Sequence, residues 1–215
     1  MKLSDRLSSV LEYIDSTDIV ADIGADHGYL SAAMLDLGVK HIQIVENKTE
    51  PLKRAQSTLL GYKNVSFSLS SGLNELEDCI NTVTICGMGG LNIIDILTED
   101  LDKAKKLKKL ILQANSKVYE LRKFLMDNNF NIIAENIVYE KNKYYEIIVC
   151  QYSDKLVNYS YEELYFGPYL IKTKSQTFIE KYKMLQKQYR KILSDTNIPS
   201  LKEDLSLIDS VLEDK

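Results

Sequence analysis

The hydrophobic positions of the first 150 residues form short continuous runs that alternate with stretches of helical spacing. Runs rich in Ile and Val predict buried strands, whereas apolar residues three and four positions apart predict amphipathic helices. Strands separated by helices pair in parallel through right-handed crossovers. The expected strands are 18–23, 42–45, 65–69, 82–86 and 110–113, and the expected helices are 3–15, 28–37, 50–60, 90–99 and 117–128.

Two further strand-like runs, 132–139 and 144–151, follow each other without a helix between them. The short Lys141-Asn142-Lys143 segment leaves room only for a hairpin turn, so the last strand is antiparallel to at least one neighbour. The pattern therefore predicts an α/β fold with a mostly parallel seven-stranded sheet and a terminal antiparallel hairpin. Within it, Thr49 is expected to be the N-cap of the helix over 50–60.

The chain after Ser153 has a different pattern. A short helix over 162–172 is interrupted by Gly167-Pro168, and apolar residues at helical spacing predict a long helix over 173–194. Residues 197–200 break it, and a returning apolar stripe runs from Leu201 to Leu212. This pattern predicts an antiparallel, coiled-coil-like helical hairpin. We therefore expect two domains, residues 1–153 and 154–215.

Composition narrows the class of protein. The 215 residues are 45% hydrophobic, which is enough for one sizeable core and a small appendage. No apolar run approaches the roughly 18 residues of a membrane span, and the chain opens into an amphipathic helix rather than a signal peptide. The three cysteines lack C-x-x-C spacing. We therefore expect a cytoplasmic protein with buried free thiols, no membrane contact and no metal.

The charge is unevenly distributed. The net charge of -4 argues against a globally basic nucleic-acid binder. Between Lys172 and Lys191, however, Glu180 is the single acid among many basic residues. This segment is either a local electropositive surface or simply a solvated helix face, and the charge pattern leaves both open.

The segment Asp22-Ile23-Gly24-Ala25-Asp26-His27-Gly28 lies where the first strand passes into a helix. Its glycines let the backbone turn sharply and approach a ligand closely. The next strand ends in Glu46, and an acid at that strand end typically binds the ribose of a nucleoside cofactor. The two strand ends predict a nucleoside pocket, although a tight turn without a ligand is the simpler alternative.

The charge of this loop separates two cofactor classes. Dinucleotide sites use a G-x-G-x-x-G loop that surrounds a pyrophosphate, but Asp26 occupies the position of the middle glycine and would repel it. S-adenosylmethionine carries a sulfonium and an ammonium group, which acids at Asp22 or Asp26 suit. The loop therefore favours S-adenosylmethionine over NAD.

Three other loops follow the expected parallel strands at the same edge, where open α/β sheets bind ligands. The Cys86-Gly87-Met88-Gly89-Gly90 segment offers bare backbone that can line a crevice. Ser70–Leu73 is either a simple turn or an adenine-binding loop, and Gln113-Ala114-Asn115 ends its strand with two amide side chains.

Several of these segments together resemble one known family, the bacterial tRNA adenine-22 N1-methyltransferases. They are ADIGADHGYL at 21–30, CGMGG at 86–90, ILQAN at 111–115, Leu121-Arg122 and the stretch from Glu140 to Ile147. Phe166-Gly167-Pro168 with the helical hairpin resembles their C-terminal domain. The resemblance implies a Rossmann-like class I methyltransferase fold, S-adenosylmethionine as the donor, and N1 of a D-loop adenine in tRNA as the acceptor.

The resemblance also implies roles for individual residues. Asp22, Gly24 and Gly28 would form the amino-acid side of the cofactor pocket. Glu46 would hold the ribose, with Asn47 beside the adenine. Position 71 is serine where the family commonly has an aspartate that accepts the adenine amino group. The residues expected to flank the adenine and the sulfonium are Ser71, Gly72, Leu73, Cys86, Gly87 and Met88.

The chemistry of the acceptor suggests catalytic candidates. N1 of adenine is available only outside a Watson–Crick pair, and the methylated base is cationic. Our hypothesis assigns Asp26 to charge stabilisation and proton removal, and His27 to orienting the base or relaying a proton. Tyr29 would stack on the adenine. The alternatives are backbone hydrogen bonding for His27 and plain packing for Tyr29, and His41 is expected to be structural.

The remaining predicted contacts are with tRNA, and the protein is expected to act as a monomer. Phosphate contacts position an RNA without reading its sequence. Other acceptors remain open, namely another RNA base or a small molecule. A non-catalytic RNA-binding protein with a vestigial cofactor fold is also open, although the intact acids at 22 and 46 argue against it. The predicted tRNA contacts are Arg6, Asn115, Lys172, Lys181, Lys183, Lys187 and Arg190.

Overall fold

The structure is a computed structural model that describes residues 3–213. The chain divides into two compact units, one ending at Asn158 and the other beginning at Tyr159. The sequence places this boundary about five residues earlier, near Ser153, because that is where the last strand pattern ends. Among the described residues, no helix is both long and apolar enough to cross a membrane.

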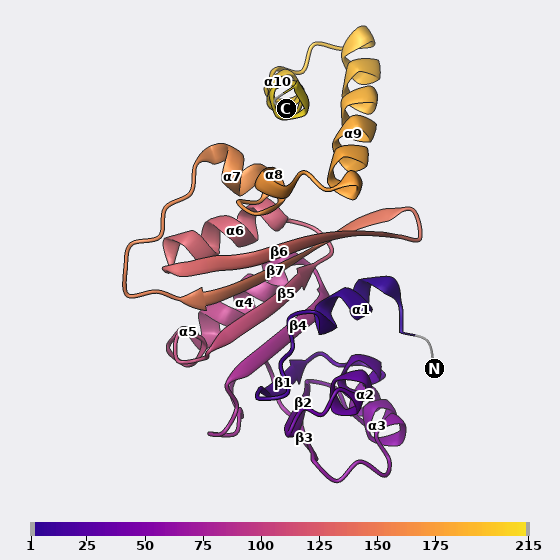
Figure 1. The fold of residues 1–215 in the computed structure, drawn as a ribbon, viewed down its shortest axis with the longest axis vertical. Helices are drawn as coiled ribbons and strands as arrows, with labels where there is room; N and C mark the ends of the chain where they lie inside the picture. Colours follow the sequence, from indigo (N-terminus) through magenta and orange to yellow (C-terminus); the bar gives the residue numbers. More distant parts are fainter. Residues whose placement is uncertain (1–2, 214–215) are drawn as a thin grey trace. The chain divides into compact units, whose positions relative to one another are not determined.

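The first unit is built on one seven-stranded sheet with the order β3-β2-β1-β4-β5-β7-β6 (Figure 1). Strands β1 to β5 pair in parallel, while β7 is antiparallel to both β5 and β6. The expected parallel sheet with a terminal antiparallel hairpin is confirmed. The strands are β1 Ile19–Ile23, β2 His41–Glu46, β3 Val65–Leu69, β4 Thr82–Met88, β5 Lys109–Ala114, β6 Phe130–Glu140 and β7 Lys143–Tyr152.

Helices cover both faces of this sheet, with α1, α2 and α3 on one face and α4, α5 and α6 on the other (Figure 1). Side chains of the inner strands such as Val20, Ile44 and Ile111 are fully buried, as expected for parallel strands that are covered on both faces. The helices are α1 Asp5–Leu11, α2 Tyr29–Asp36, α3 Thr49–Thr58, α4 Gly90–Glu99, α5 Leu101–Ala104 and α6 Val118–Asp127.

Two local predictions were wrong. The N-cap of α3 is Lys48, whose backbone is extended, so Thr49 is the first helical residue and makes no capping bond. Cys79 is exposed, because it lies in the turn before β4 rather than in a strand. Cys150 is buried and Cys86 is partly buried, and all three thiols are free.

The second unit contains α7 Tyr161–Phe166, α8 Leu170–Thr173, α9 Gln176–Asp195 and α10 Pro199–Glu213. A capping box joins Ser160 and Glu163 at the start of α7. The expected hairpin is confirmed, because α9 packs against α10. The break between the two helices is residues 196–198 rather than the predicted 197–200. Pro199 opens α10, where its missing N–H costs no hydrogen bond. The buried side chains of this unit include Phe166, Phe178, Tyr182, Ile208 and Val211.

Candidate active site

Two adjoining cavities lie at the carboxyl ends of β1, β2 and β4. The larger has a volume of about 460 Å³ and is lined by residues of the β1–α2 loop, α1, β4 and the β6–β7 hairpin. The smaller, of about 300 Å³, lies between the ends of β2 and β3 and helix α4. Gly24 and Met88 line both cavities. Ligands in the two cavities would therefore meet at this pair of residues.

Gly24 occupies a position that no other residue would fill easily. Its φ is +71°, in the left-handed region that favours glycine, and its N–H donates to the Val45 carbonyl at 2.9 Å. A Cβ built on Gly24 would lie 2.1 Å from the Met88 Cε atom. The bare backbone of Gly24 therefore lets the Met88 side chain lie against the loop where the two cavities join.

The smaller cavity combines acids, amides and backbone. Glu46 and Asn47 come from the end of β2, and Ser71 and Gly72 come from the loop after β3. Glu46 is only 6% exposed, and its Oε1 accepts the Asp26 backbone N–H at 2.5 Å. Burial raises the pKa of the Glu46 carboxyl group. Because Glu46 lines the cavity, its second oxygen, Oε2, could accept hydrogen bonds from the vicinal hydroxyl groups of a ribose.

Helix α4 adds three polar residues to this cavity that sequence reasoning missed, Asn92, Asp95 and Glu99. They lie on the exposed face of an amphipathic helix, where polar residues are expected anyway. No sequence signal distinguishes them from ordinary surface residues. Because position 71 is serine in this chain, an acid of α4, Asp95 or Glu99, could accept an adenine amino group instead.

Asp22 is a buried acid beside the larger cavity. Its side chain is 2% exposed and accepts hydrogen bonds from Ser31 Oγ at 2.6 Å and Thr84 Oγ1 at 2.7 Å. Burial raises the pKa of Asp22, and the two hydroxyl donors oppose that shift. Among the described residues, no Lys or Arg forms an ion pair with this carboxylate. An ammonium group in the cavity would supply the missing positive charge.

Replacing Asp22 with asparagine is expected to raise Tm by several degrees in the absence of ligand, while weakening S-adenosylmethionine binding at least about tenfold. The folded-state pKa of Asp22 is raised, so its contribution to stability is greatest below the unfolded pKa and is lost as pH rises through the folded pKa. The gain in Tm should therefore be larger at pH 7 than at pH 4. Calorimetry and thermal melts measure both effects, and an unchanged affinity would remove Asp22 from the cofactor site.

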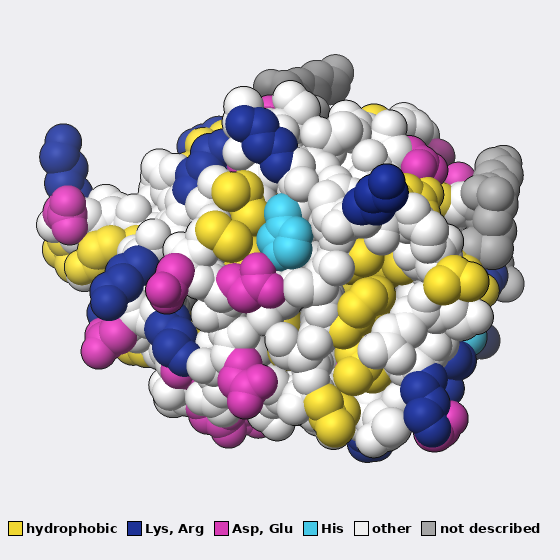
Figure 2. All heavy atoms as spheres, turned by 90° about the horizontal axis from the view of Figure 1, so that it is seen from below, with side chains coloured by type: hydrophobic (Ala, Val, Ile, Leu, Met, Phe, Trp, Pro, Cys, Tyr) yellow, Lys and Arg dark blue, Asp and Glu magenta, His cyan; other side chains and the backbone are white. Residues whose placement is uncertain are grey.

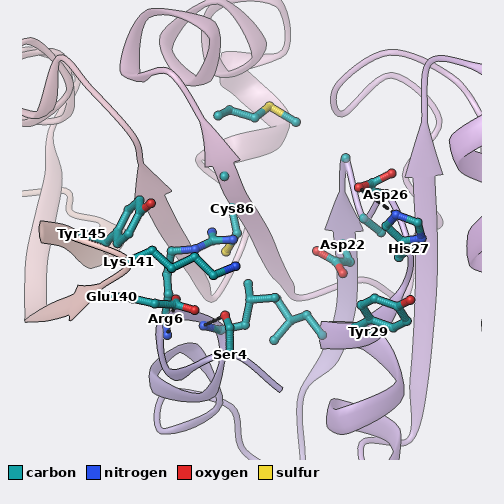
Figure 3. Close-up of a pocket in the computed structure, with 16 residues that line it drawn as sticks. Ser4, Arg6, Asp22, Asp26, His27, Tyr29, Cys86, Glu140, Lys141 and Tyr145 are labelled. Atoms are coloured by element: carbon teal, nitrogen blue, oxygen red, sulfur yellow. Dashed lines mark hydrogen bonds and ion pairs between the residues drawn. The ribbon is translucent and has the colours of Figure 1, made fainter. Parts of the chain in front are cut away.

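Asp26, His27 and Tyr29 lie together on one wall of the larger cavity (Figure 3). The ring of His27 stacks on that of Tyr29, with centroids 5.2 Å apart and planes 8° from parallel. His27 Nε2 lies 3.7 Å from Asp26 Oδ2. All three side chains are accessible from solvent, at 59% for Asp26, 47% for His27 and 36% for Tyr29. The structure brings the three predicted catalytic residues together at an open surface.

A fourth residue, Arg54 of α3, contacts Asp26 from outside the cavity lining and was not predicted. Its Nη2 donates to Asp26 Oδ1 at 2.6 Å. Asp26 itself has a φ of +50°, an uncommon conformation for a residue with a side chain. The Arg54 contact and the hydrogen bond from the Asp26 N–H to Glu46 both hold this conformation.

The opposite wall is formed by α1 and the β6–β7 hairpin, which contribute Arg6, Glu140, Lys141 and Tyr145 (Figure 3). The Arg6 guanidinium lies over the Tyr145 ring, 5.4 Å from its centroid, and donates to Gln113 Oε1. Arg6, which we predict to contact tRNA, therefore lines the larger cavity. The hairpin residues were missed because the sequence indicates a turn at 141–143 without indicating that it reaches the β1–α2 loop.

The Gly87 backbone is fixed by two amide side chains from the end of β5. Gln113 Oε1 accepts the Gly87 N–H at 3.0 Å, and Asn115 Nδ2 donates to the Gly87 carbonyl at 2.6 Å. Asn115 thus supports the loop and is not part of the lining of either cavity. Gln113, which is fully buried, also holds Arg6.

Two predicted cofactor residues also lie outside the lining of both cavities. Gly28 has a φ of +69° and packs against α3, where an added Cβ would lie 3.3 Å from the Ala55 Cα atom. Leu73 is fully buried in the core. Gly28 supports the β1–α2 loop, and Leu73 supports the loop after β3. Cys86, Gly87 and Met88 line the larger cavity.

The five predicted basic residues of the second unit fall into two groups. Lys183 and Lys187 are exposed on the face of α9 opposite to Phe178 and Tyr182. The other three contact neighbours: Arg190 pairs with Asp209 at 3.0 Å, Lys172 lies 5.6 Å from the Tyr169 ring centroid, and Lys181 lies 4.8 Å from that of Tyr182. On the face of the molecule shown in Figure 2, acidic and basic side chains are interspersed.

Comparisons with known proteins point to one family. The family model described as tRNA (adenine(22)-N(1))-methyltransferase matches residues 20–215. The tRNA (adenine(22)-N(1))-methyltransferase of Bacillus subtilis is 32% identical over 191 residues, which cover 85% of this chain and 80% of that protein.

Solved structures agree with this match. Streptococcus pneumoniae Sp1610, solved in complex with S-adenosyl-L-methionine, superposes with a TM-score of 0.90 at 31% identity, covering 98% of this chain and 100% of that one. An M. capricolum protein, solved with the cofactor product S-adenosyl-homocysteine, gives a TM-score of 0.85 at 25% identity, covering 99% of each chain.

Proposed function

We propose that this chain, which belongs to the tRNA (adenine(22)-N(1))-methyltransferase family, transfers a methyl group from S-adenosylmethionine to N1 of adenine 22 in tRNA. The family match confirms the expected methyltransferase class and its donor. Within the chain, the observation that carries the proposal is the meeting of two cavities at Gly24 and Met88. A donor whose nucleoside lies in the smaller cavity would pass this pair of residues into the larger cavity, where the base would meet its methyl group.

The residues of the smaller cavity suit the nucleoside end of the donor. S-adenosylmethionine supplies, when bound, a methyl group on a sulfonium cation. Glu46 would accept hydrogen bonds from the ribose hydroxyls, and an acid of α4 would accept the adenine amino group. Asp22 would face the ammonium group from the larger cavity. The Gly24 backbone and Met88 would flank the sulfonium, where a larger residue at position 24 would displace the Met88 side chain.

The larger cavity suits the acceptor adenine. The base must leave any pairing partner to expose N1, and the cavity opens to solvent on the side of Asp26, His27 and Tyr29. Tyr29 offers a ring face on which the base can stack. Asp26 would stabilise the cationic methylated base and accept a proton from its exocyclic amine, while His27 would orient the base. Alignment of the acceptor for in-line attack can contribute about 7–11 kcal/mol.

The second unit would hold the tRNA backbone. Lys183 and Lys187 form an exposed basic face on α9. Lys172, Lys181 and Arg190, which contact neighbouring side chains, would add further phosphate contacts. Such contacts position a phosphate backbone without reading its sequence. We expect the protein to act on tRNA as a monomer in the cytoplasm.

The direct test is transfer of a labelled methyl group from S-adenosylmethionine to tRNA transcripts that carry A or G at position 22. We expect label only in the A22 transcript, and mapping of the modified base should place it at N1 of that adenine. Label in both transcripts would indicate another acceptor base. Absence of transfer, with S-adenosylmethionine bound, would favour the alternative of a non-catalytic RNA-binding protein.

A further inference from the structure

Three potential metal ligands lie together at the amino end of β2, whereas the two cavities lie at the carboxyl ends of the strands. His41 is the first residue of β2, and Glu77 and Cys79 lie in the segment between β3 and β4. His41 Nε2 lies 2.8 Å from Glu77 Oε2, and Cys79 Sγ lies 3.7 Å from the same oxygen. All three donor atoms lie within 4.8 Å of one another. From this geometry we infer that His41, Glu77 and Cys79 form a Zn²⁺ site.

The ligand types favour zinc over the common oxygen-binding cations. Imidazole nitrogen, thiolate sulfur and carboxylate oxygen are the usual Zn²⁺ ligands, whereas Mg²⁺ and Ca²⁺ prefer oxygen alone. Zinc lies about 2.0–2.3 Å from such ligands, so ligand atoms in a tetrahedral site are about 3.3–3.7 Å apart. Small side-chain rotations bring the three donor atoms to this spacing. Metal binding displaces the Cys79 thiol proton, and any proton on His41 Nε2, to solvent.

The immediate surroundings support coordination. Ser66 Oγ lies 3.2 Å from His41 Nε2, so its hydroxyl or a water molecule can fill the fourth position. The His41 side chain is 26% exposed and that of Glu77 is 37% exposed, which leaves a path for the ion. An imidazole nitrogen, a carboxylate oxygen and a sulfur atom thus lie around one accessible point.

A buried side chain holds the segment that carries two of the ligands. Gln43, on β2 two residues after His41, is 1% exposed. Its Oε1 accepts the Glu77 N–H at 2.9 Å, and its Nε2 donates to the Glu75 carbonyl at 2.6 Å. Supporting contacts of this kind orient the ligands of metal sites. Glu77 is therefore fixed to the strand that supplies His41.

The metal site lies on the same segment of chain as part of the smaller cavity. The segment that contains Glu77 and Cys79 begins at Ser70, and its first residues line the smaller cavity. Zinc would clamp one end of this segment to β2 while the other end lines the proposed nucleoside pocket. Since an ion that binds only the folded state raises Tm, we expect Zn²⁺ to stabilise the chain. His41 and Glu77 are 36 positions apart in the sequence, and Cys79 follows Glu77 by two. This spacing matches no common metal motif, which explains why the sequence led us to expect no metal.

The test uses the full chain, stripped of metal with a chelator and then titrated with ZnCl₂ against a chromogenic competitor. We expect one Zn²⁺ per chain and an increase in Tm. Cys79→Ser and His41→Gln should each weaken binding at least about tenfold. Asp78→Asn, a change in the exposed acid between two ligands, is the matched control and should leave the affinity unchanged.

Cobalt provides a second readout that does not depend on the stability of the variants. Co²⁺ in the wild-type chain should give a thiolate-to-cobalt charge-transfer absorption that Cys79→Ser removes. A chain that binds no Zn²⁺, a cobalt complex without this absorption, or an equal loss of affinity in Asp78→Asn and Cys79→Ser would each overturn the inference. None of these outcomes would count against the proposed methyl transfer, because the metal ligands lie at the amino end of β2 and outside the lining of both cavities.

Discussion

Replacing Asp26 with asparagine is expected to lower kcat for tRNA methylation by about 10²–10³-fold while changing the dissociation constant of S-adenosylmethionine less than about threefold. The substitution keeps the shape of the side chain and an oxygen that can accept from Arg54. It removes the negative charge that would stabilise the cationic product and the group that would accept the amine proton. Single-turnover methyl transfer measures the rate, and calorimetry measures donor binding.

Arg54→Gln is the matched control for this prediction. It removes the 2.6 Å ion pair with Asp26 but leaves the carboxylate itself. We expect a loss of kcat of no more than about tenfold, because an exposed ion pair contributes little. If kcat and donor affinity fall equally in Asp26→Asn, Asp26 is a binding residue and not a catalytic one.

Replacing Lys183, Lys187 and Lys191 together with glutamine is expected to weaken tRNA binding at least about tenfold at physiological salt. These lysines are four residues apart on one exposed face of α9. Loss of three phosphate contacts should also reduce the slope of log K against log salt by about 2–3. Fluorescence anisotropy with labelled tRNA over a range of salt concentrations measures both quantities.

Lys202→Gln tests whether any exposed lysine of the hairpin would have the same effect. Lys202 is exposed on α10, and we expect its replacement to leave tRNA affinity and the salt slope unchanged. S-adenosylmethionine affinity should be unchanged in both variants. An unaltered salt slope in the triple variant would mean that this face of α9 does not contact RNA and would favour a protein partner for the hairpin.

The fold could be predicted from the sequence because its strands are short, apolar and separated by amphipathic helices. The runs at Val65–Leu69 and Gly90–Glu99 have the bounds that periodicity predicts. Helix α5, at Leu101–Ala104, was missed because four residues are too few to show a helical period. The Lys48 cap was missed because the sequence offers Thr49, a better capping residue, one position later.

The site could be predicted only in part. Residues of the β1–α2 loop are close in sequence, so the pattern that identifies Asp26 also identifies His27 and Tyr29. Tyr145 and Lys141 reach the same cavity from more than 110 positions away, and only the antiparallel hairpin brings them there. Arg54 and Asp95 lie on amphipathic helices, where charged residues are expected on the solvent face. Tertiary packing brings these residues to the site, and the local sequence pattern around each residue does not reveal it.

Donor binding by the Glu46→Gln variant tests the central claim most directly, because Glu46 is the buried acid between the β2 end and the Asp26 backbone. Calorimetry should show that the wild-type chain binds S-adenosylmethionine and not NAD, and that Glu46→Gln weakens donor binding at least about tenfold. Tight binding of NAD by the wild-type chain, or an unchanged donor affinity in Glu46→Gln, would contradict it.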